Sequence, residues 1–143
     1  MRRGDDGATA VEFALIVLPF ITFVFAAVDF GLWEYQQSQT NAASRDGVRQ
    51  AVLYATSATG INQVTTAAKA RVGIAKSGIT VTMTCKDGTT GATIVCTNAV
   101  PGADTVTVTV ASTYQPLTPV LGQIIGNRTI VATSTQVVTG LPQ

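Results

Sequence analysis

The chain has 143 residues, of which 46% are hydrophobic and only 12% are charged, and its formal net charge is +1. That length accommodates one domain, and such sparse charge is typical of a membrane-associated or exported protein. Histidine is absent, which removes the commonest general base and most zinc sites. No cluster of Lys and Arg suggests a nucleic-acid partner. We therefore expect no enzyme, no catalytic residue, no metal site, no cofactor and no nucleic-acid binding.

The first strong pattern is an uncharged apolar run from Phe13 to Val28, which continues through Asp29 to Gly31. As a helix, residues 13–31 would span about 28 Å, close to the hydrocarbon thickness of a bilayer. A proline inside such a run is tolerated in membrane helices as a kink. Arg2 and Arg3 favour a cytoplasmic N-terminus. The run predicts a single pass through a membrane, at residues 11–31, with the rest of the chain extracytoplasmic.

Three interpretations of this N-terminal segment compete. It could be a plain signal-anchor, or a secretory signal cut after Val24-Phe25-Ala26, although its apolar region is longer than the ~7–15 residues usual for such signals. The third is a prepilin-type leader cut between Gly7 and Ala8, which alone accounts for Gly7 and Glu12 together. A carboxylate in a bilayer costs roughly 2.5–3.5 kcal/mol or more at the centre, so it needs a partner. The cut would create an ammonium group at Ala8, one helical turn from Glu12.

The segment after the membrane run is predicted to continue the same helix. No strong breaker occurs between Leu32 and Tyr54, which predicts a helix over about 9–54 with a length of about 70 Å. Trp33 and Tyr35 suit a membrane–water interface. Asp29 is expected to reach interfacial water or to pair between subunits. One face of the helix is expected to pack on the protein's own sheet, with Ser44, Val48, Ala51, Val52 and Ala55 on it.

The remainder predicts a small packed domain. A break at 57–60 precedes a helix over 61–76, whose apolar stripe is residues 61, 64, 68, 72 and 75 and which ends at Lys76-Ser77-Gly78. Alternating runs at 79–85, 93–96, 105–110 and 129–138 predict strands with threonine on the solvent face. The expected fold class is α+β: a long helix, partly transmembrane and partly stalk, packed on a small antiparallel sheet.

Two connections carry further expectations. Cys85 and Cys96 flank the turn signal Lys86-Asp87-Gly88, so a disulfide across a hairpin is expected in an oxidising compartment, with free buried thiols as the alternative. The apolar segment 116–126 is expected to cap the core, to lie on the membrane or to contact another subunit, and core capping is the first choice.

The N-terminal third resembles a known family. The run from Gly7 to Pro19 (Gly-Ala-Thr-Ala-Val-Glu-Phe-Ala-Leu-Ile-Val-Leu-Pro), the exit sequence Val28-Asp-Phe-Gly31 and the element Asn41–Arg49 resemble TadE-like proteins. These are minor pilin or pseudopilin components of tight-adherence, Flp-type IV pilus systems. Ser44 interrupts the family's Ala-Ala-Arg order, a small departure.

The resemblance implies a site and partners. A membrane-embedded prepilin peptidase would cut between Gly7 and Ala8, and Glu12 and Phe13 would act in processing or assembly. Other pilin or pseudopilin subunits, the inner-membrane assembly platform and the lipid bilayer would be the remaining partners. The implied division is a leader at 1–7, a helix at 8–54 with its stalk at 32–54, and an extracytoplasmic domain at 55–143. The alternative is a signal-anchored or secreted extracytoplasmic binding or adhesin domain at the cell surface.

Overall fold

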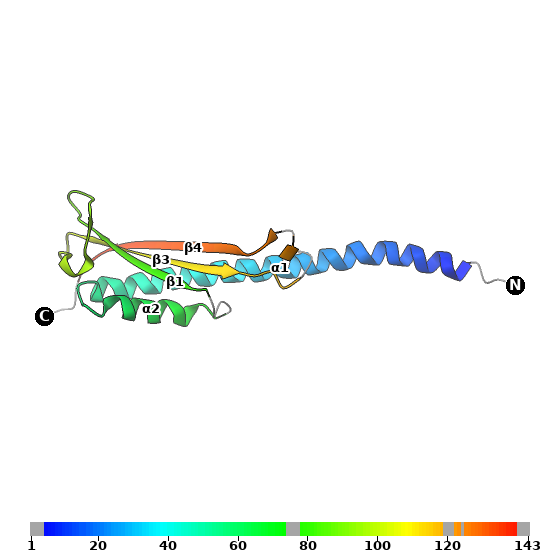
Figure 1. Ribbon diagram of the computed structural model, residues 1–143, viewed down its shortest axis with the longest axis horizontal. Helices are drawn as coiled ribbons and strands as arrows, with labels where there is room; N and C mark the ends of the chain where they lie inside the picture. Colours follow the sequence, from blue (N-terminus) through cyan, green and yellow to red (C-terminus); the bar gives the residue numbers. More distant parts are fainter. Residues whose placement is uncertain (1–4, 74–77, 119–121, 124, 140–143) are drawn as a thin grey trace.

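The computed structural model describes residues 5–73, 78–118, 122–123 and 125–139. One helix, α1 (Asp5–Tyr54), runs nearly the full length of the molecule, and the other elements gather around its C-terminal half (Figure 1). α1 passes through Pro19 without interruption, as the sequence predicted for a membrane helix. The predicted end at Tyr54 is confirmed, whereas the helix begins four residues before the predicted start. Arg2 and Arg3, on which the predicted orientation rests, lie outside the described residues.

The second helix, α2 (Gly60–Arg71), is shorter than predicted. Val72 leaves the helical region with φ −90° and ψ 85°, and Lys76, the predicted end, lies outside the described residues. Val64 and Ala68 are buried as expected, but Ile61 is 37% exposed. Gly60 is buried instead. Glycine is required there, because any Cβ would lie 2.1 Å from the carbonyl oxygen of Tyr54.

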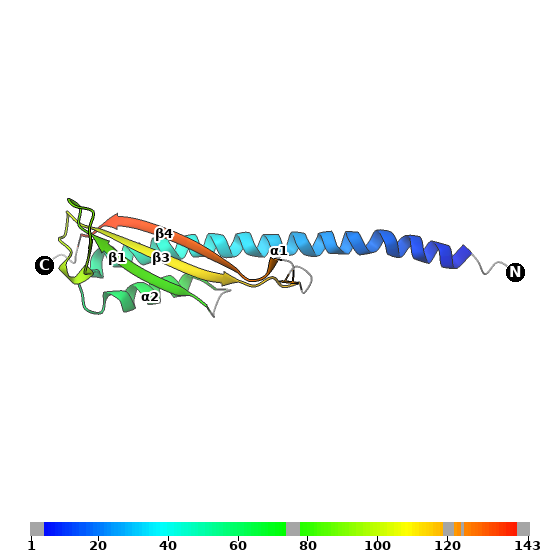
Figure 2. The same ribbon diagram turned by 45° about the horizontal axis from the view of Figure 1, so that its top comes forward.

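Four antiparallel strands form one sheet in the order β2-β1-β3-β4, and Figure 2 shows β1, β3 and β4 side by side. They are β1 (Thr80–Lys86), β2 (Thr93–Ile94), β3 (Thr105–Tyr114) and β4 (Arg128–Val137), with a 3-10 turn, η1 (Cys96–Asn98), after β2. The predicted α+β class and the four strands are confirmed. β3 is four residues longer than predicted, because Ala111–Tyr114 continue its alternation and pair with Arg128–Val131.

The core lies between the sheet and the two helices. Val106, Val108 and Val110 are fully buried on the inner face of β3. They pack with the face of α1 that the sequence predicted, since Ser44, Val48, Ala51 and Ala55 are buried and Val52 is partly buried. Gly47 of α1 faces both β3 and α2, because a Cβ there would lie 3.0 Å from Cγ1 of Val108 and 3.6 Å from Val64 and Ala68.

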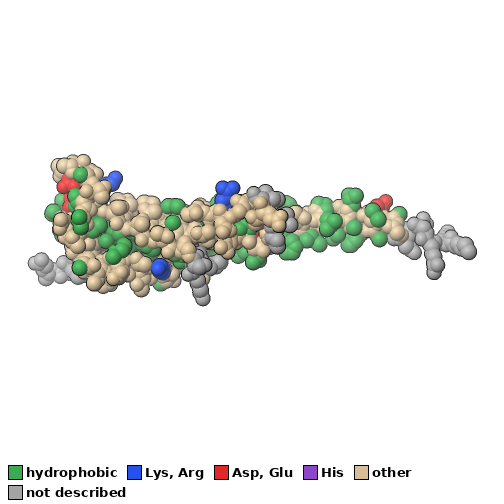
Figure 3. All heavy atoms as spheres, viewed as in Figure 1, with side chains coloured by type: hydrophobic (Ala, Val, Ile, Leu, Met, Phe, Trp, Pro, Cys, Tyr) green, Lys and Arg blue, Asp and Glu red, His purple; other side chains and the backbone are tan. Residues whose placement is uncertain are grey.

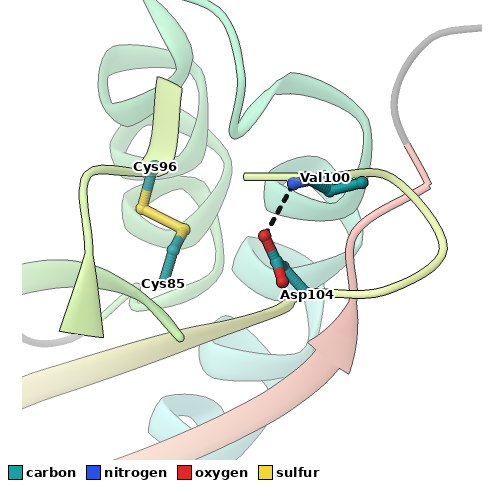
Figure 4. The surroundings of a disulfide bond; sticks show 4 residues. All are labelled: Cys85, Cys96, Val100 and Asp104. Atoms are coloured by element: carbon teal, nitrogen blue, oxygen red, sulfur yellow. Dashed lines mark hydrogen bonds between the residues drawn. A yellow bond between two sulfur atoms is a disulfide. The ribbon is translucent and has the colours of Figure 1, made fainter. Parts of the chain in front are cut away.

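The end of the sheet away from the apolar helix is fixed by a disulfide and two carboxylates. Cys85 and Cys96 form the predicted disulfide (Figure 4). Beside it, Asp104 accepts hydrogen bonds from the backbone N–H groups of Gly88 at 3.0 Å and Val100 at 2.7 Å. These bonds join the turn after β1 to the loop before β3, so this end of the domain does not depend on apolar burial alone.

The predicted turn after β1 is confirmed, and Asp87 organises it. Its Oδ1 accepts hydrogen bonds from the backbone N–H of Thr89 at 2.9 Å and from that of Thr90 at 2.6 Å. The hydroxyl of Thr90 donates a third bond to the same oxygen at 2.9 Å. The bonds from Thr90 and then from Thr89 favour the ionised carboxylate and hold the pKa of Asp87 below its ordinary value.

Candidate functional site

The four residues predicted to act in processing and assembly lie within the first turns of α1. Gly7, Ala8, Glu12 and Phe13 are all exposed, and Phe13 has 67% of its surface accessible. A Cβ added at Gly7 would meet nothing within 4 Å, so packing within the subunit does not require glycine there. Ala8 and Glu12 stand one turn apart on the same helical face. In the part of the chain that the structure describes, no ion pair involves Glu12. The roles of these four residues stay predictions.

The N-terminal half of α1 projects beyond the domain with its apolar side chains exposed. Figure 3 shows hydrophobic side chains covering this part of the helix on the face in view. Most of its large apolar side chains have between 43% and 74% of their surface accessible, namely Val11, Phe13, Leu15, Ile16, Leu18, Phe20, Ile21, Phe23, Val24, Phe25, Val28 and Phe30. α1 is long and apolar enough to cross a membrane, and none of its most apolar stretch is buried. The N-terminal half of α1 is therefore a candidate membrane span, whereas its C-terminal half packs in the core of the domain.

At the end of this stretch, Asp29 is enclosed by the β3–β4 connection. The residue is only 5% exposed. Its Oδ1 accepts hydrogen bonds from the backbone N–H of Leu117 at 2.8 Å and the hydroxyl of Tyr114 at 3.3 Å. Its Oδ2 accepts one from the N–H of Thr118 at 3.2 Å and a shorter one from the Thr118 hydroxyl. The expected access of Asp29 to interfacial water was wrong, because the residue is buried and bonded within its own subunit, while pairing between subunits stays an expectation. We call these four residues the Asp29 clamp.

The clamp fixes the β3–β4 connection against the helix where the apolar stretch ends. The Tyr114 hydroxyl also donates to the backbone oxygen of Asp29 at 2.8 Å. Burial of Tyr114 and the adjacent carboxylate both disfavour a phenolate, so the pKa of Tyr114 is raised. Core capping by the connection was wrong for Leu117, which is 73% exposed. Residues 119–121 and 124 of the predicted apolar loop lie outside the described part of the chain.

A row of buried and half-buried polar side chains joins α1 to the sheet, between the clamp and the C-terminal end of the helix. The Gln36 amide donates to Ser112 Oγ at 3.2 Å, and the Thr40 and Ser112 hydroxyls lie 2.8 Å apart. One turn further, the Ser44 and Ser134 hydroxyls lie 2.9 Å apart. We call these five residues the polar seam. Sequence reasoning missed it, although Gln36, Thr40 and Ser44 recur every four residues in line with the apolar stripe.

The fold and the exposed helix define a class: a small α+β domain carried on a helix capable of spanning a membrane. Among protein-family models, residues 7–49 match the family described as TadE-like protein. The resemblance to TadE-like proteins is therefore confirmed over this segment, which begins at the predicted cleavage residue and ends within the stalk. Searches of curated proteins and of solved structures returned no match.

Proposed function

We propose that this chain is a minor pilin or pseudopilin subunit of a Tad-type pilus assembly system, stored in the inner membrane and processed at its leader before assembly. One observation carries the proposal. The match to TadE-like proteins covers residues 7–49, and within that segment most large apolar side chains of the N-terminal half of α1 are exposed. A helix with this surface needs lipid or other helices around it, and a pilin-type subunit uses both in turn.

The proposed processing step is a cut by a prepilin peptidase between Gly7 and Ala8. Glycine before the scissile bond leaves the backbone accessible, and no contact within the subunit accounts for it. The cut would remove the leader at 1–7 and leave a helix at 8–54 that carries an outer domain at 55–143. The new ammonium group of Ala8 would then lie one turn from Glu12, in the same subunit or presented by a neighbouring one. Such pairing compensates a carboxylate that is costly in lipid.

The proposed mechanism is assembly and involves no chemical turnover. Lipid tails are as apolar as leucine, so moving an apolar helix from lipid into a bundle gains little hydrophobic free energy. Packing between helices and the pairing of Glu12 would therefore decide which subunits associate. The partners in this scheme are other pilin or pseudopilin subunits and the inner-membrane assembly platform.

The mass of the native N-terminus tests the proposal most directly. We expect the protein isolated from the cells that produce it to begin at Ala8. A start at Ala27 would indicate a secretory signal, and a start at Met1 a plain anchor. Either result would overturn the pilin proposal and favour a binding or adhesin domain at the cell surface.

A second experiment tests the role assigned to Glu12. We expect Glu12→Ala to impair leader processing, incorporation into the pilus, or both, while the outer domain stays folded. Glu34→Ala is the matched control, because Glu34 is an exposed acidic residue of the same helix beyond the apolar stretch. Processing and pilus formation that are normal in the Glu12 variant would refute the proposed role.

A further inference from the structure

A groove lies where the helix leaves its apolar stretch. It has a volume of about 690 Å³ and runs between α1 and the first residues of β4. Ala26, Phe30 and Trp33 of α1, Ile125, and Arg128 and Val131 of β4 line it. Three of its apolar side chains are well exposed, with Phe30 and Val131 at 59% and Ile125 at 42%. We call it the junction groove. Its volume lies within the range of about 300–1,000 Å³ that small-molecule sites occupy.

The groove changes from apolar to polar along the helix. Its lining on α1 begins at Ala26 and Phe30 and ends at Gln37 and Asn41, about 22 Å further along at the helical rise. If the apolar stretch fills the bilayer, the lower part of the groove lies in hydrocarbon and the upper part in the headgroup region. Trp33 lies between the two, at the depth where tryptophan is enriched in membrane proteins.

The accessible charge of the groove is positive. Two charged residues line it, Asp29 and Arg128. Asp29 is nearly inaccessible and accepts the hydrogen bonds of the clamp. Arg128 is exposed, and within the described part of the chain it takes part in no ion pair. Arg128 pairs across the sheet with Tyr114, whose hydroxyl reaches Asp29, so its backbone lies near the level where the apolar stretch ends.

We propose that the junction groove binds one anionic phospholipid. Its phosphate contacts Arg128, since a guanidinium matches the geometry of phosphate oxygens. One acyl chain lies against Phe30, Ile125 and Ala26, and the rest of the headgroup extends along the helix toward Gln37. The apolar-to-polar lining along α1, the exposed cation Arg128 and the position of the groove at the end of the apolar stretch all agree with this occupant. A helix from a second copy fits less well, because two helical turns occupy roughly 850 Å³, more than the groove holds, and would cover the Arg128 guanidinium without an ion-pair partner.

The proposal rests on the membrane anchoring put forward above, but on neither leader cleavage nor pilus assembly. It is tested with the full-length chain in nanodiscs that contain phosphatidylglycerol and phosphatidylcholine in equal amounts. Native mass spectrometry then counts the lipid molecules that stay bound to the released protein. We expect the unaltered chain to retain one phosphatidylglycerol. We expect Arg128→Gln to weaken that retention about fivefold, the effect typical of losing one cation near a membrane surface.

Two matched controls separate the site from general effects. Lys86→Gln removes an exposed cation at the other end of the sheet, and we expect it to leave lipid retention unchanged. Val131→Asp places an anion in the groove and should abolish phosphatidylglycerol retention. Val137→Asp, at a 46% exposed valine of the same strand outside the groove, should not. Circular dichroism checks that each variant is folded.

The outcomes are distinct. Equal retention of the two lipids by the unaltered chain refutes the lipid site, as does an Arg128→Gln variant that keeps the preference for phosphatidylglycerol. A photo-crosslinker at position 131 that captures a second copy of the chain instead of lipid also refutes it. A chain that does not enter the nanodisc refutes membrane anchoring itself, and with it this proposal.

Discussion

Replacing Asp29 with alanine should loosen the β3–β4 connection from the helix. The substitution removes the acceptor for two backbone N–H groups and two hydroxyls. A buried donor left without a partner costs roughly 1–3 kcal/mol. The donors of Leu117 and Thr118 can partly recover by bonding to water, because Leu117 is exposed. We therefore expect a loss of about 2–4 kcal/mol, well below the sum over all four donors.

The single tryptophan makes this prediction measurable. Trp33 is the only tryptophan in the chain, and it stands one helical turn after Asp29. We expect its fluorescence to report unfolding of the Asp29→Ala variant at a lower urea concentration than for the unaltered chain, both in detergent micelles. Hydrogen exchange gives a local measure, since the amides of Leu117 and Thr118 should lose their protection in the variant.

Asp29→Asn supplies a graded comparison. The amide keeps one acceptor oxygen for Leu117 and Tyr114, but its NH₂ group faces the N–H of Thr118. We expect about half the loss of the alanine variant, roughly 1–2 kcal/mol. Two results together would show that the clamp does not hold the connection. The first is an Asp29→Ala variant that is as stable as the unaltered chain. The second is free exchange of the Leu117 and Thr118 amides in the unaltered chain.

Three further outcomes are expected. The double substitution Cys85→Ser and Cys96→Ser should lower the free energy of unfolding in urea by about 2–3 kcal/mol. A double variant with the same urea midpoint as the unaltered, oxidised chain would contradict this. Gly47→Leu should cost about 1–3 kcal/mol, because even a Cβ there lies 3.0 Å from Val108; a thermal midpoint equal to that of the unaltered chain would show that the helix can move away. Asp87 should titrate by NMR below its ordinary value of 3.8. Since its folded pKa is lowered, its stabilising effect is present above that value and is lost as the pH falls through the folded pKa. A midpoint at or above 3.8 would refute the turn bonds.

Periodicity made much of the fold predictable from sequence. The alternation of valine and threonine in β3 identified which side chains face the core, because side chains in a strand point to opposite faces in turn. The apolar spacing from Val48 to Ala55 likewise identified the inner face of α1. These features depend on residues close together in the chain, and local patterns report them well.

The contacts that position the candidate site were not predictable in this way. The Asp29 clamp joins residues separated by 85 or more positions in the chain, and an aspartate at the end of an apolar run looks the same whether it meets water or a loop. The polar seam was missed for a related reason. A buried Thr40 is identified only by its partner Ser112, and the partner is known only once the helix and sheet are docked.

The polar seam also has a mechanical consequence. α1 lies along β3 and β4, so its bonds to Ser112 and Ser134 and the clamp at Asp29 all link the same two layers. A pull on the apolar end of the helix would strain these bonds together in shear, since none can open alone without the others stretching. Load is thereby shared over several turns of helix. A subunit held in an assembly only by its N-terminal helix could then bear tension without shedding its outer domain.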